Sequence, residues 1–313
     1  MSGIYDVIII GGGVAGFSAA MYAGRLKMKT LVIAAIRGGT IVQTNDIANW
    51  PGIKQTDGIT LATNIEKHAT SYEDVSVIDE TVIEVKKSSK GYTAATESEK
   101  HFSAKTLIFA TGTEWRKLEV PGEKEFAGRG VHYCALCDGY FYKEKIIAVV
   151  GGADSATKEA VLLTQWAKKV YMVYRGEKIR PEPITLARAD EKIKQGKLEI
   201  INNANIIEIK GADRVTNVLL DREYNGSREF KLDGIFVAIG HTPNSSLAKS
   251  IGVNIDKGGH IKINRNSETN LDGVFAAGDV TDTGFKQAII ASAEGVHAIY
   301  SAYEYLKNSK NKE

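Results

Sequence analysis

The chain has 313 residues, of which 43% are hydrophobic and 25% are charged. This length is sufficient for two domains with buried cores, so the fold does not need a metal or a disulfide for stability. A net charge of only +2 gives no electrostatic reason to expect a nucleic acid or an anionic membrane as a partner.

The N-terminus predicts a strand rather than a targeting signal. Its apolar run at residues 7–10 is short, stops at glycine and follows no basic region, unlike a signal peptide. No stretch of the chain approaches the ~18 apolar residues that span a bilayer. We therefore expect a cytoplasmic protein, in a compartment where thiols are kept reduced.

Residues 6–26, DVIIIGGGVAGFSAAMYAGRL, predict a strand, a glycine turn and a helix. The turn fits the G-x-G-x-x-G pattern of dinucleotide-binding βαβ units. In that pattern Gly11 permits the tight turn, Gly13 lets the backbone approach a pyrophosphate, and Gly16 allows close helix–strand packing. The pyrophosphate then lies at the positive end of the helix. The alternative is a tight turn that holds no ligand.

The next expected strand, LVIAAI at residues 31–36, lacks the acidic residue that usually follows it and binds the ribose. It runs into Arg37 and two glycines instead. Ribose recognition must come from elsewhere, and the backbone amides of Gly38, Gly39 and Thr40 are the candidates.

The strand–turn–helix pattern returns at residues 145–169. A strand-like run that ends in glycine follows each copy, at 106–112 and at 234–240. A third such run, at 273–280, precedes a helical pattern at 287–306 and has no glycine-rich partner. These repeats predict an α/β fold with two Rossmann-like three-layer dinucleotide-binding domains.

The simplest layout inserts the second domain into the first. We expect one domain at residues 1–114 and 243–313 and the inserted domain at residues 115–242.

Both cysteines of the chain, Cys134 and Cys137, form one C-x-x-C motif. With His132 they supply three possible zinc ligands, but no second cysteine pair exists and the other histidines are scattered. A permanent disulfide across so short a loop would remove little chain entropy. Redox cycling is favoured, because a C-x-x-C at a helix N-terminus activates one thiol. Asp138 follows directly, either as a proton donor or acceptor or as an ordinary acidic residue of a first helical turn.

The second glycine turn, at residues 151–156, departs from the pattern because Ala153 replaces the middle glycine. A methyl group there holds a pyrophosphate slightly further away. Cations follow the next strand, where an NAD site would carry an acidic residue; they suit the 2′-phosphate of NADP or form only a solvated basic loop. The candidates for this second nucleotide site are Gly152, Ala153, Asp154, Ser155, Ala156, Arg175, Lys178, Arg180 and Gly240.

Two dinucleotide sites and one redox dithiol in a single chain suggest an electron relay. A nicotinamide gives hydride, a flavin accepts it as an electron pair, and the dithiol passes the pair onward. The flavin is needed because hydride does not readily reduce a disulfide directly.

The chain resembles the low-molecular-weight thioredoxin reductases, FAD-containing pyridine nucleotide-disulfide oxidoreductases, over nearly its whole length. The resemblance rests on GGGVAG at 11–16, NWPG at 49–52, ATG at 110–112, CALCDGYF at 134–141, GHTPN at 240–244, AAGDV at 276–280 and KQA at 286–288. It implies an FAD-binding first domain and an inserted NADPH-binding domain that carries the dithiol and swings as a body. It also implies a homodimer that reduces thioredoxin or a thioredoxin-like protein.

The resemblance assigns individual roles as well. Cys137 would be the sulfur nearer the flavin, Cys134 its partner, and Asp138 the acid that protonates the departing thiolate. Which cysteine attacks the protein substrate stays open. Asp279 would bond the ribityl chain of FAD, and Gln287 and Ala288 would lie near the isoalloxazine. The other residues expected to bind FAD are Gly11, Gly13, Gly16, Gly38, Gly39, Thr40, Ile41, Asn49, Ala110, Thr111, Gly112, Gly278 and Lys286.

The nicotinamide part departs most from the family. Its members carry His-Arg-Arg, three residues and then Arg, whereas this chain has Tyr174-Arg175-Gly176 and then Arg180, with Lys178 as a possible substitute. NADH or ferredoxin as donor therefore stays open, as does operation as a dithiol oxidase. A zinc-bearing nucleotide-binding module without catalysis is the more remote alternative.

Overall fold

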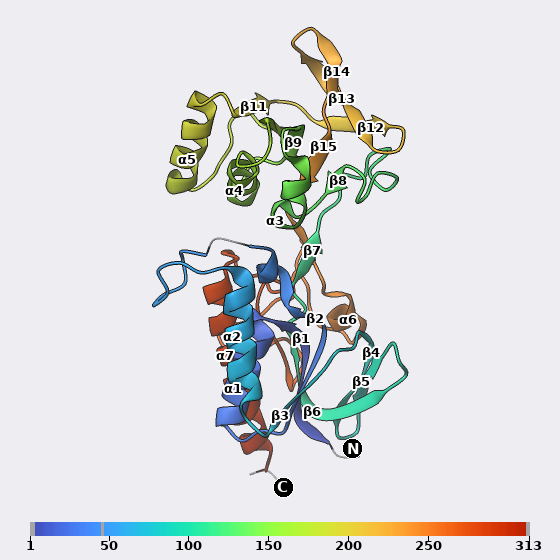
Figure 1. The fold of residues 1–313 in the computed structure, drawn as a ribbon. Helices are drawn as coiled ribbons and strands as arrows, with labels where there is room; N and C mark the ends of the chain where they lie inside the picture. Colours follow the sequence, from blue (N-terminus) through green and yellow to red (C-terminus); the bar gives the residue numbers. More distant parts are fainter. Residues whose placement is uncertain (1–3, 45–46, 311–313) are drawn as a thin grey trace. The chain divides into compact units, whose positions relative to one another are not determined.

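The computed structural model describes residues 4–44 and 47–310. The chain divides into two compact units, Met1–Glu114 with Thr242–Glu313, and Trp115–His241. It passes between them along two short strands, β7 (Thr113–Trp115) and β16 (His241–Pro243), which pair with each other (Figure 1).

The first unit is built on a seven-stranded sheet in the order β3-β2-β1-β6-β5-β4, with β17 also paired to β6. Strands β1, β2, β3, β6 and β17 run parallel, whereas β4, β5 and β6 form an antiparallel meander. The strands are β1 (Tyr5–Gly13), β2 (Thr30–Gly38), β3 (Val75–Ile78), β4 (Val82–Ser88), β5 (Gly91–Thr96), β6 (His101–Phe109) and β17 (Val274–Ala276).

Helices cover one face of this sheet, and Figure 1 shows α1, α2 and α7 side by side. Residues 7–10 of β1 are all apolar because both faces of the strand are buried there. Val7 and Ile9 pack with the helices, and Ile8 and Ile10 pack toward the meander. The helices are α1 (Val14–Arg25), α2 (Gly58–Thr70), α6 (Ser246–Ser250), α7 (Ala288–Lys310) and the 3₁₀ turn η1 (Gly39–Gln43).

The second unit repeats this architecture with a five-stranded parallel sheet in the order β11-β10-β9-β15-β8. Helices pack on one face, and the antiparallel sheet β12-β13-β14 packs on the other. Its strands are β8 (Val131–His132), β9 (Ile146–Val150), β10 (Lys169–Tyr174), β11 (Leu198–Asn202), β12 (Ile206–Gly211), β13 (Val215–Tyr224), β14 (Ser227–Lys231) and β15 (Gly234–Val237). Its helices are α3 (Ala135–Asp138), η2 (Gly139–Tyr142), α4 (Asp154–Leu163) and α5 (Pro183–Lys194).

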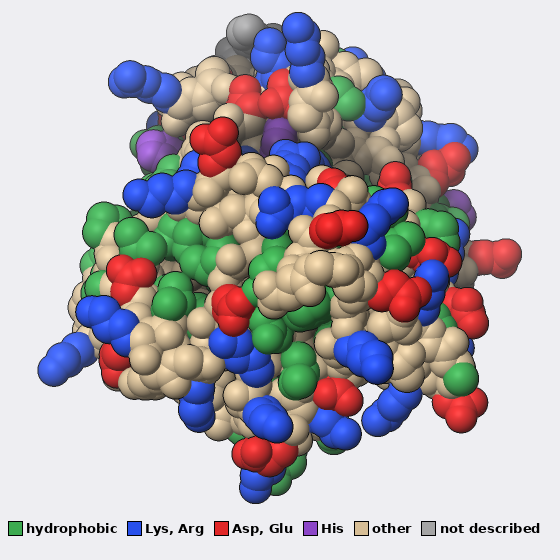
Figure 2. Space-filling view, turned by 90° about the horizontal axis from the view of Figure 1, so that it is seen from above, with side chains coloured by type: hydrophobic (Ala, Val, Ile, Leu, Met, Phe, Trp, Pro, Cys, Tyr) green, Lys and Arg blue, Asp and Glu red, His purple; other side chains and the backbone are tan. Residues whose placement is uncertain are grey.

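The predicted α/β fold with two dinucleotide-binding units is confirmed. Among the described residues, no helix is both long and apolar enough to cross a membrane. Figure 2 shows basic and acidic side chains interspersed on the face it presents, without a broad patch of one sign.

Candidate active site: a disulfide and two glycine turns

Cys134 and Cys137 form a disulfide, with their Cα atoms 5.3 Å apart. Cys134 is the N-cap of α3, and its sulfur accepts a hydrogen bond of 3.1 Å from the backbone N–H of Cys137. Cys134 is only 8% exposed, whereas Cys137 is exposed. The sequence predicted a helix N-terminus here, but α3 is a single turn of four residues. A local N–H group, rather than a long helix dipole, therefore acts on the sulfur.

A chain of polar contacts leads away from the disulfide through Asp138. His132 Nδ1 lies 3.1 Å from Asp138 Oδ2, and His132 Nε2 lies 2.8 Å from the Tyr142 hydroxyl. The imidazole is buried and stacks on Phe236, with ring centroids 5.4 Å apart. Burial raises the pKa of Tyr142 to about 12. Both ring nitrogens of His132 already have polar partners, and both sulfurs are bonded to each other. This arrangement therefore does not favour the zinc site considered above.

The first glycine turn links β1 to α1 in the other unit. Gly11 has a φ of +115°, and a Cβ there would lie 2.2 Å from the carbonyl oxygen of Ala110. A Cβ on Gly16 would lie 2.0 Å from the oxygen of Gly11, so both glycines allow close packing within the chain. Gly13 differs, since a Cβ there would find no atom nearer than 3.8 Å. The chain's own packing does not require glycine at that position, and the free space fits the approach of a pyrophosphate.

Other predicted FAD residues gather at the same edge, where the parallel strands end. Gly13 pairs with Gly38 in the register of β1 and β2, and Gly39 to Ile41 continue into η1. Ala110 N–H donates to Ile10, which places Ala110 to Gly112 beside the turn. Gly278 and Asp279 follow β17, the neighbour of β6. The edge thus offers glycine turns from four strands, and it fits a dinucleotide.

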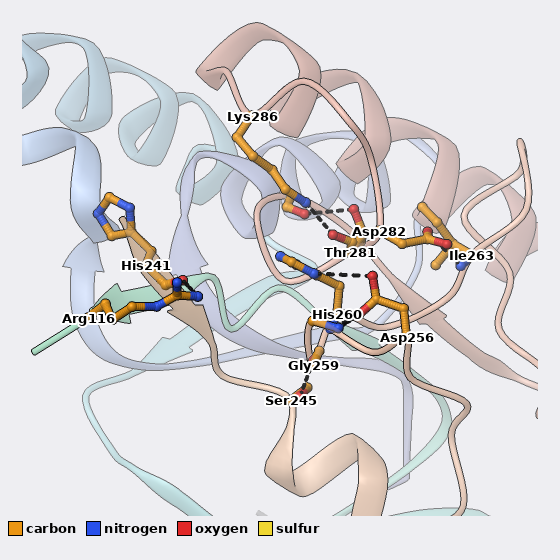
Figure 3. A network of polar contacts seen from close by, with 12 residues as sticks. Arg116, His241, Ser245, Asp256, Gly259, His260, Ile263, Thr281, Asp282 and Lys286 are labelled. Atoms are coloured by element: carbon orange, nitrogen blue, oxygen red, sulfur yellow. Dashed lines mark hydrogen bonds and ion pairs between the residues drawn. The ribbon is translucent and has the colours of Figure 1, made fainter. Parts of the chain in front are cut away.

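The last group of predicted residues lies at and before the start of α7. Asn49 Nδ2 donates to Gln287 Oε1 at 2.9 Å, which joins two candidates 238 positions apart. Lys286 Nζ donates to the backbone oxygen of Thr281 (Figure 3), and burial lowers its pKa. Gly278, Asp279, Lys286 and Gln287 line one small pocket.

Arg37 stands where an acidic ribose ligand is usual, and it is held by two carboxylates. Its guanidinium lies 2.6 Å from Asp79 and 2.6 Å from Glu66. Hydrogen bonds from Asp79 and then Glu66 raise the pKa of Arg37.

The second glycine turn, between β9 and α4, is more crowded. A Cβ on Gly152 would lie 2.3 Å from the ring of Tyr174, and the N–H of Arg180 donates to the Gly152 oxygen at 2.6 Å. Ala153 is the N-cap of α4, and its methyl group is exposed. The loop after β10 therefore folds back across the turn.

Three of the predicted nucleotide residues in this loop are free cations. Arg175, Lys178 and Arg180 are exposed, and none of them forms an ion pair within the described part of the chain. Asp154, in contrast, is engaged, because it accepts from the N–H of Glu182 at 2.9 Å and pairs with a lysine. The remaining candidates lie close by: Ser155 and Ala156 in the first turn of α4, and Gly240 just before β16.

Two carboxylates that accept hydrogen bonds from backbone N–H groups were not predicted from the sequence. Glu294, in α7, accepts from the backbone N–H of Gly278 at 2.8 Å. Glu123 is 2% exposed and accepts from Leu118 N–H at 2.8 Å and from the Tyr133 hydroxyl at 2.8 Å. The only sequence signal for Glu294 was an acidic residue among the small residues of α7. For Glu123 there was no signal in the sequence.

Known proteins resemble this chain over almost all of its length. The family described as pyridine nucleotide-disulphide oxidoreductase matches residues 5–295. The thioredoxin reductase of Bacillus subtilis is 39% identical, over 97% of this chain and 95% of its own length. A solved structure, thioredoxin reductase of Lactococcus lactis, superposes with a TM-score of 0.91 at 35% identity, covering 97% of this chain and 99% of its own.

A relative with a different activity is almost as similar. The glucosaminate ammonia-lyase of Pseudomonas fluorescens is 37% identical over 97% of both chains. Overall similarity alone therefore does not decide the reaction, and the chemistry of the site must carry that argument.

Proposed function

This chain belongs to the pyridine nucleotide-disulphide oxidoreductase family, and on that basis we propose that it is a flavin-dependent thioredoxin reductase of the low-molecular-weight type. It takes electrons from NADPH and delivers them through FAD and the Cys134–Cys137 pair to thioredoxin or a thioredoxin-like protein. The observation that carries the proposal is the disulfide itself. Its sulfurs are bridged, Cys137 is an exposed residue, and the backbone N–H of Cys137 contacts the sulfur of Cys134.

The positions of the FAD candidates support FAD as the cofactor. Gly13 leaves space at the start of α1, and the glycine turns after β2, β6 and β17 lie at the same sheet edge. FAD, when bound, would supply the two-electron chemistry that links a nicotinamide to a disulfide. The residues of the chain would hold it at the N-terminus of α1, with Asp279 and Lys286 as polar contacts.

The dithiol chemistry belongs to α3. Opening the disulfide with two electrons gives two thiolates, and one of them takes up a proton. The hydrogen bond from Cys137 N–H favours negative charge on Cys134, and Asp138 supplies the proton that the other sulfur takes up.

Arg175, Lys178 and Arg180 support NADPH as the donor. Within the described residues these three exposed cations have no carboxylate partner, and beside a glycine turn they suit a 2′-phosphate. The crowding of Gly152 and the methyl group of Ala153 are the features that favour a second candidate, the same relay with another donor such as NADH or ferredoxin. We further propose a homodimer in the cytoplasm.

The decisive experiment is an anaerobic absorbance measurement on the FAD-supplied protein. A yellow protein that NADPH bleaches within seconds supports the proposal, and a flavin that NADPH leaves oxidised supports the second candidate. Protein that takes up no flavin contradicts both. In a coupled assay with thioredoxin, Cys134→Ser and Cys137→Ser should each abolish turnover, and full turnover in either variant would exclude a dithiol relay.

A further inference from the structure

The imidazole of His132 bridges the disulfide region and a buried phenol. It contacts Asp138 Oδ2 through Nδ1 at 3.1 Å and the Tyr142 hydroxyl through Nε2 at 2.8 Å. Phe236, which is fully buried, packs against both rings, with centroid distances of 5.4 Å to His132 and 5.5 Å to Tyr142. The imidazole is therefore held in place by an aromatic wall and two polar partners.

The polar partners also determine which nitrogen of the imidazole carries the proton. Burial keeps the Tyr142 phenol protonated, with a pKa of about 12, and the structure gives its hydroxyl no acceptor other than His132 Nε2 among the described residues. If the phenol donates, then Nε2 must accept. The hydrogen of a neutral imidazole is then on Nδ1, which points it at Asp138.

We propose that His132 is a positioning residue for the proton chemistry of the disulfide, with Tyr142 fixing its tautomer. The Nδ1–H group holds Oδ2 of Asp138 and leaves Oδ1 for proton exchange. When the disulfide opens, a proton moves from Oδ1 to the sulfur of Cys137, and it returns when the disulfide reforms. The inference rests on the proposed function, because it concerns the same dithiol.

No other charged group among the described residues forms an ion pair with Asp138, so its orientation depends on His132. The groups that act electrostatically on Tyr142 are Asp138 itself, Asp233 and Arg214. His132 and Tyr142 lie on elements next to α3, namely β8 and η2. Within the described residues, His132 is the sole ion-pairing partner of Asp138.

Two amide substitutions separate the two contacts of the imidazole. The amide nitrogen of asparagine lies where His Nδ1 lies, so His132→Asn keeps the donor to Asp138 and loses the contact with Tyr142. The amide of glutamine reaches the position of Nε2, so His132→Gln keeps the contact with Tyr142 and loses the donor. A role limited to filling space beside Phe236 predicts equal effects of the two variants.

The assay reduces the full-length, FAD-supplied protein with dithiothreitol and counts free thiols by rapid alkylation and mass spectrometry. One dithiothreitol is oxidised to its cyclic disulfide as Cys134 and Cys137 become thiols, so neither NADPH nor thioredoxin is needed. Failure of the proposed donor or substrate would therefore leave this test intact. We expect His132→Gln to slow reduction at least about 10-fold, since general acid catalysis contributes on the order of 100-fold or more. We expect His132→Asn to stay within about 3-fold of the unmodified protein, and equal rates in the two variants would overturn the inference.

A second measurement reads the tautomer of His132 in the unmodified protein. Nitrogen-15 NMR of histidine-labelled protein reports the tautomer of each imidazole, and the spectrum of His132→Asn identifies the missing signal. The inference requires His132 to be protonated on Nδ1 near neutral pH. A proton on Nε2 alone would contradict it.

Discussion

Glu294 Oε2 accepts a hydrogen bond of 2.8 Å from the backbone N–H of Gly278, sixteen residues earlier in the chain. The same carboxylate accepts from the hydroxyl of Thr281 at 3.0 Å and from the hydroxyl of Thr283. Three polar groups converge on one side chain, and of these the backbone N–H of Gly278 can only donate. Glu294 therefore fixes the turn after β17 that contains Asp279.

Glu294→Ala should destabilise this turn, because the backbone N–H of Gly278 would lose its acceptor. Leaving one such group unpaired costs about 1–3 kcal/mol. We expect a loss of that size in the free energy of urea unfolding and weaker retention of FAD in an ultrafiltration assay. Glu304→Ala on the same helix is the matched control, since within the described residues the only polar contact of the Glu304 carboxylate is the ion pair with Lys307, at 3.9 Å. Equal losses in the two variants would show that the convergent contacts are not responsible.

Arg180→Ala should weaken the binding of NADPH and leave the binding of NADH unchanged. If the exposed guanidinium meets a 2′-phosphate, its loss removes a charge-assisted contact worth about 1.5–3 kcal/mol, so KM for NADPH should rise about 10-fold or more while KM for NADH stays unchanged. Lys194→Ala, which removes an exposed cation from α5, is the control. Equal rises with both nucleotides would argue against a 2′-phosphate contact.

Much of the fold was predictable because the signal was local. The β-branched run before Gly11 and the small residues after it specify strand, turn and helix without tertiary information. The structure places Gly11, Gly38, Ala110 and Gly278 at one sheet edge, because parallel strands end on the same side.

The contacts between distant residues were not predictable in the same way. The pair Asn49–Gln287 and the bond from Gly278 to Glu294 depend on how α7 packs. The one-turn length of α3 depends on a turn into η2 that the sequence did not reveal. His132 was considered only as a metal ligand, since nothing in the sequence places Tyr142 against its other nitrogen.

The buried phenol of Tyr142 predicts a pH dependence. Burial raises its pKa to about 12 from an ordinary value of 10, so between these values the unfolded chain has lost a proton that the folded chain keeps. Stability should therefore fall as pH rises from about 10 to 12. Absorbance at 295 nm should show tyrosines that titrate late, and Tyr142→Phe should remove one of them. Tyr224, whose pKa burial also raises to about 12, should remain as an internal reference; an unchanged late phase would contradict the assignment.

The contact between Cys137 N–H and Cys134 Sγ predicts which sulfur carries the negative charge after reduction. The N–H lies 3.1 Å from that sulfur, and a donor of this kind favours the thiolate over the thiol. In Cys137→Ser, the remaining Cys134 should therefore form its thiolate at a lower pH than the remaining Cys137 does in Cys134→Ser, where the sulfur lacks this donor. Absorbance at 240 nm against pH measures both thiolates directly. A difference of about one pH unit corresponds to about 1.4 kcal/mol, within the range of a hydrogen bond to a charged group. If Cys137 ionises first, the backbone contact at Cys134 does not control the dithiol, and charge at Cys137 must be stabilised by another group.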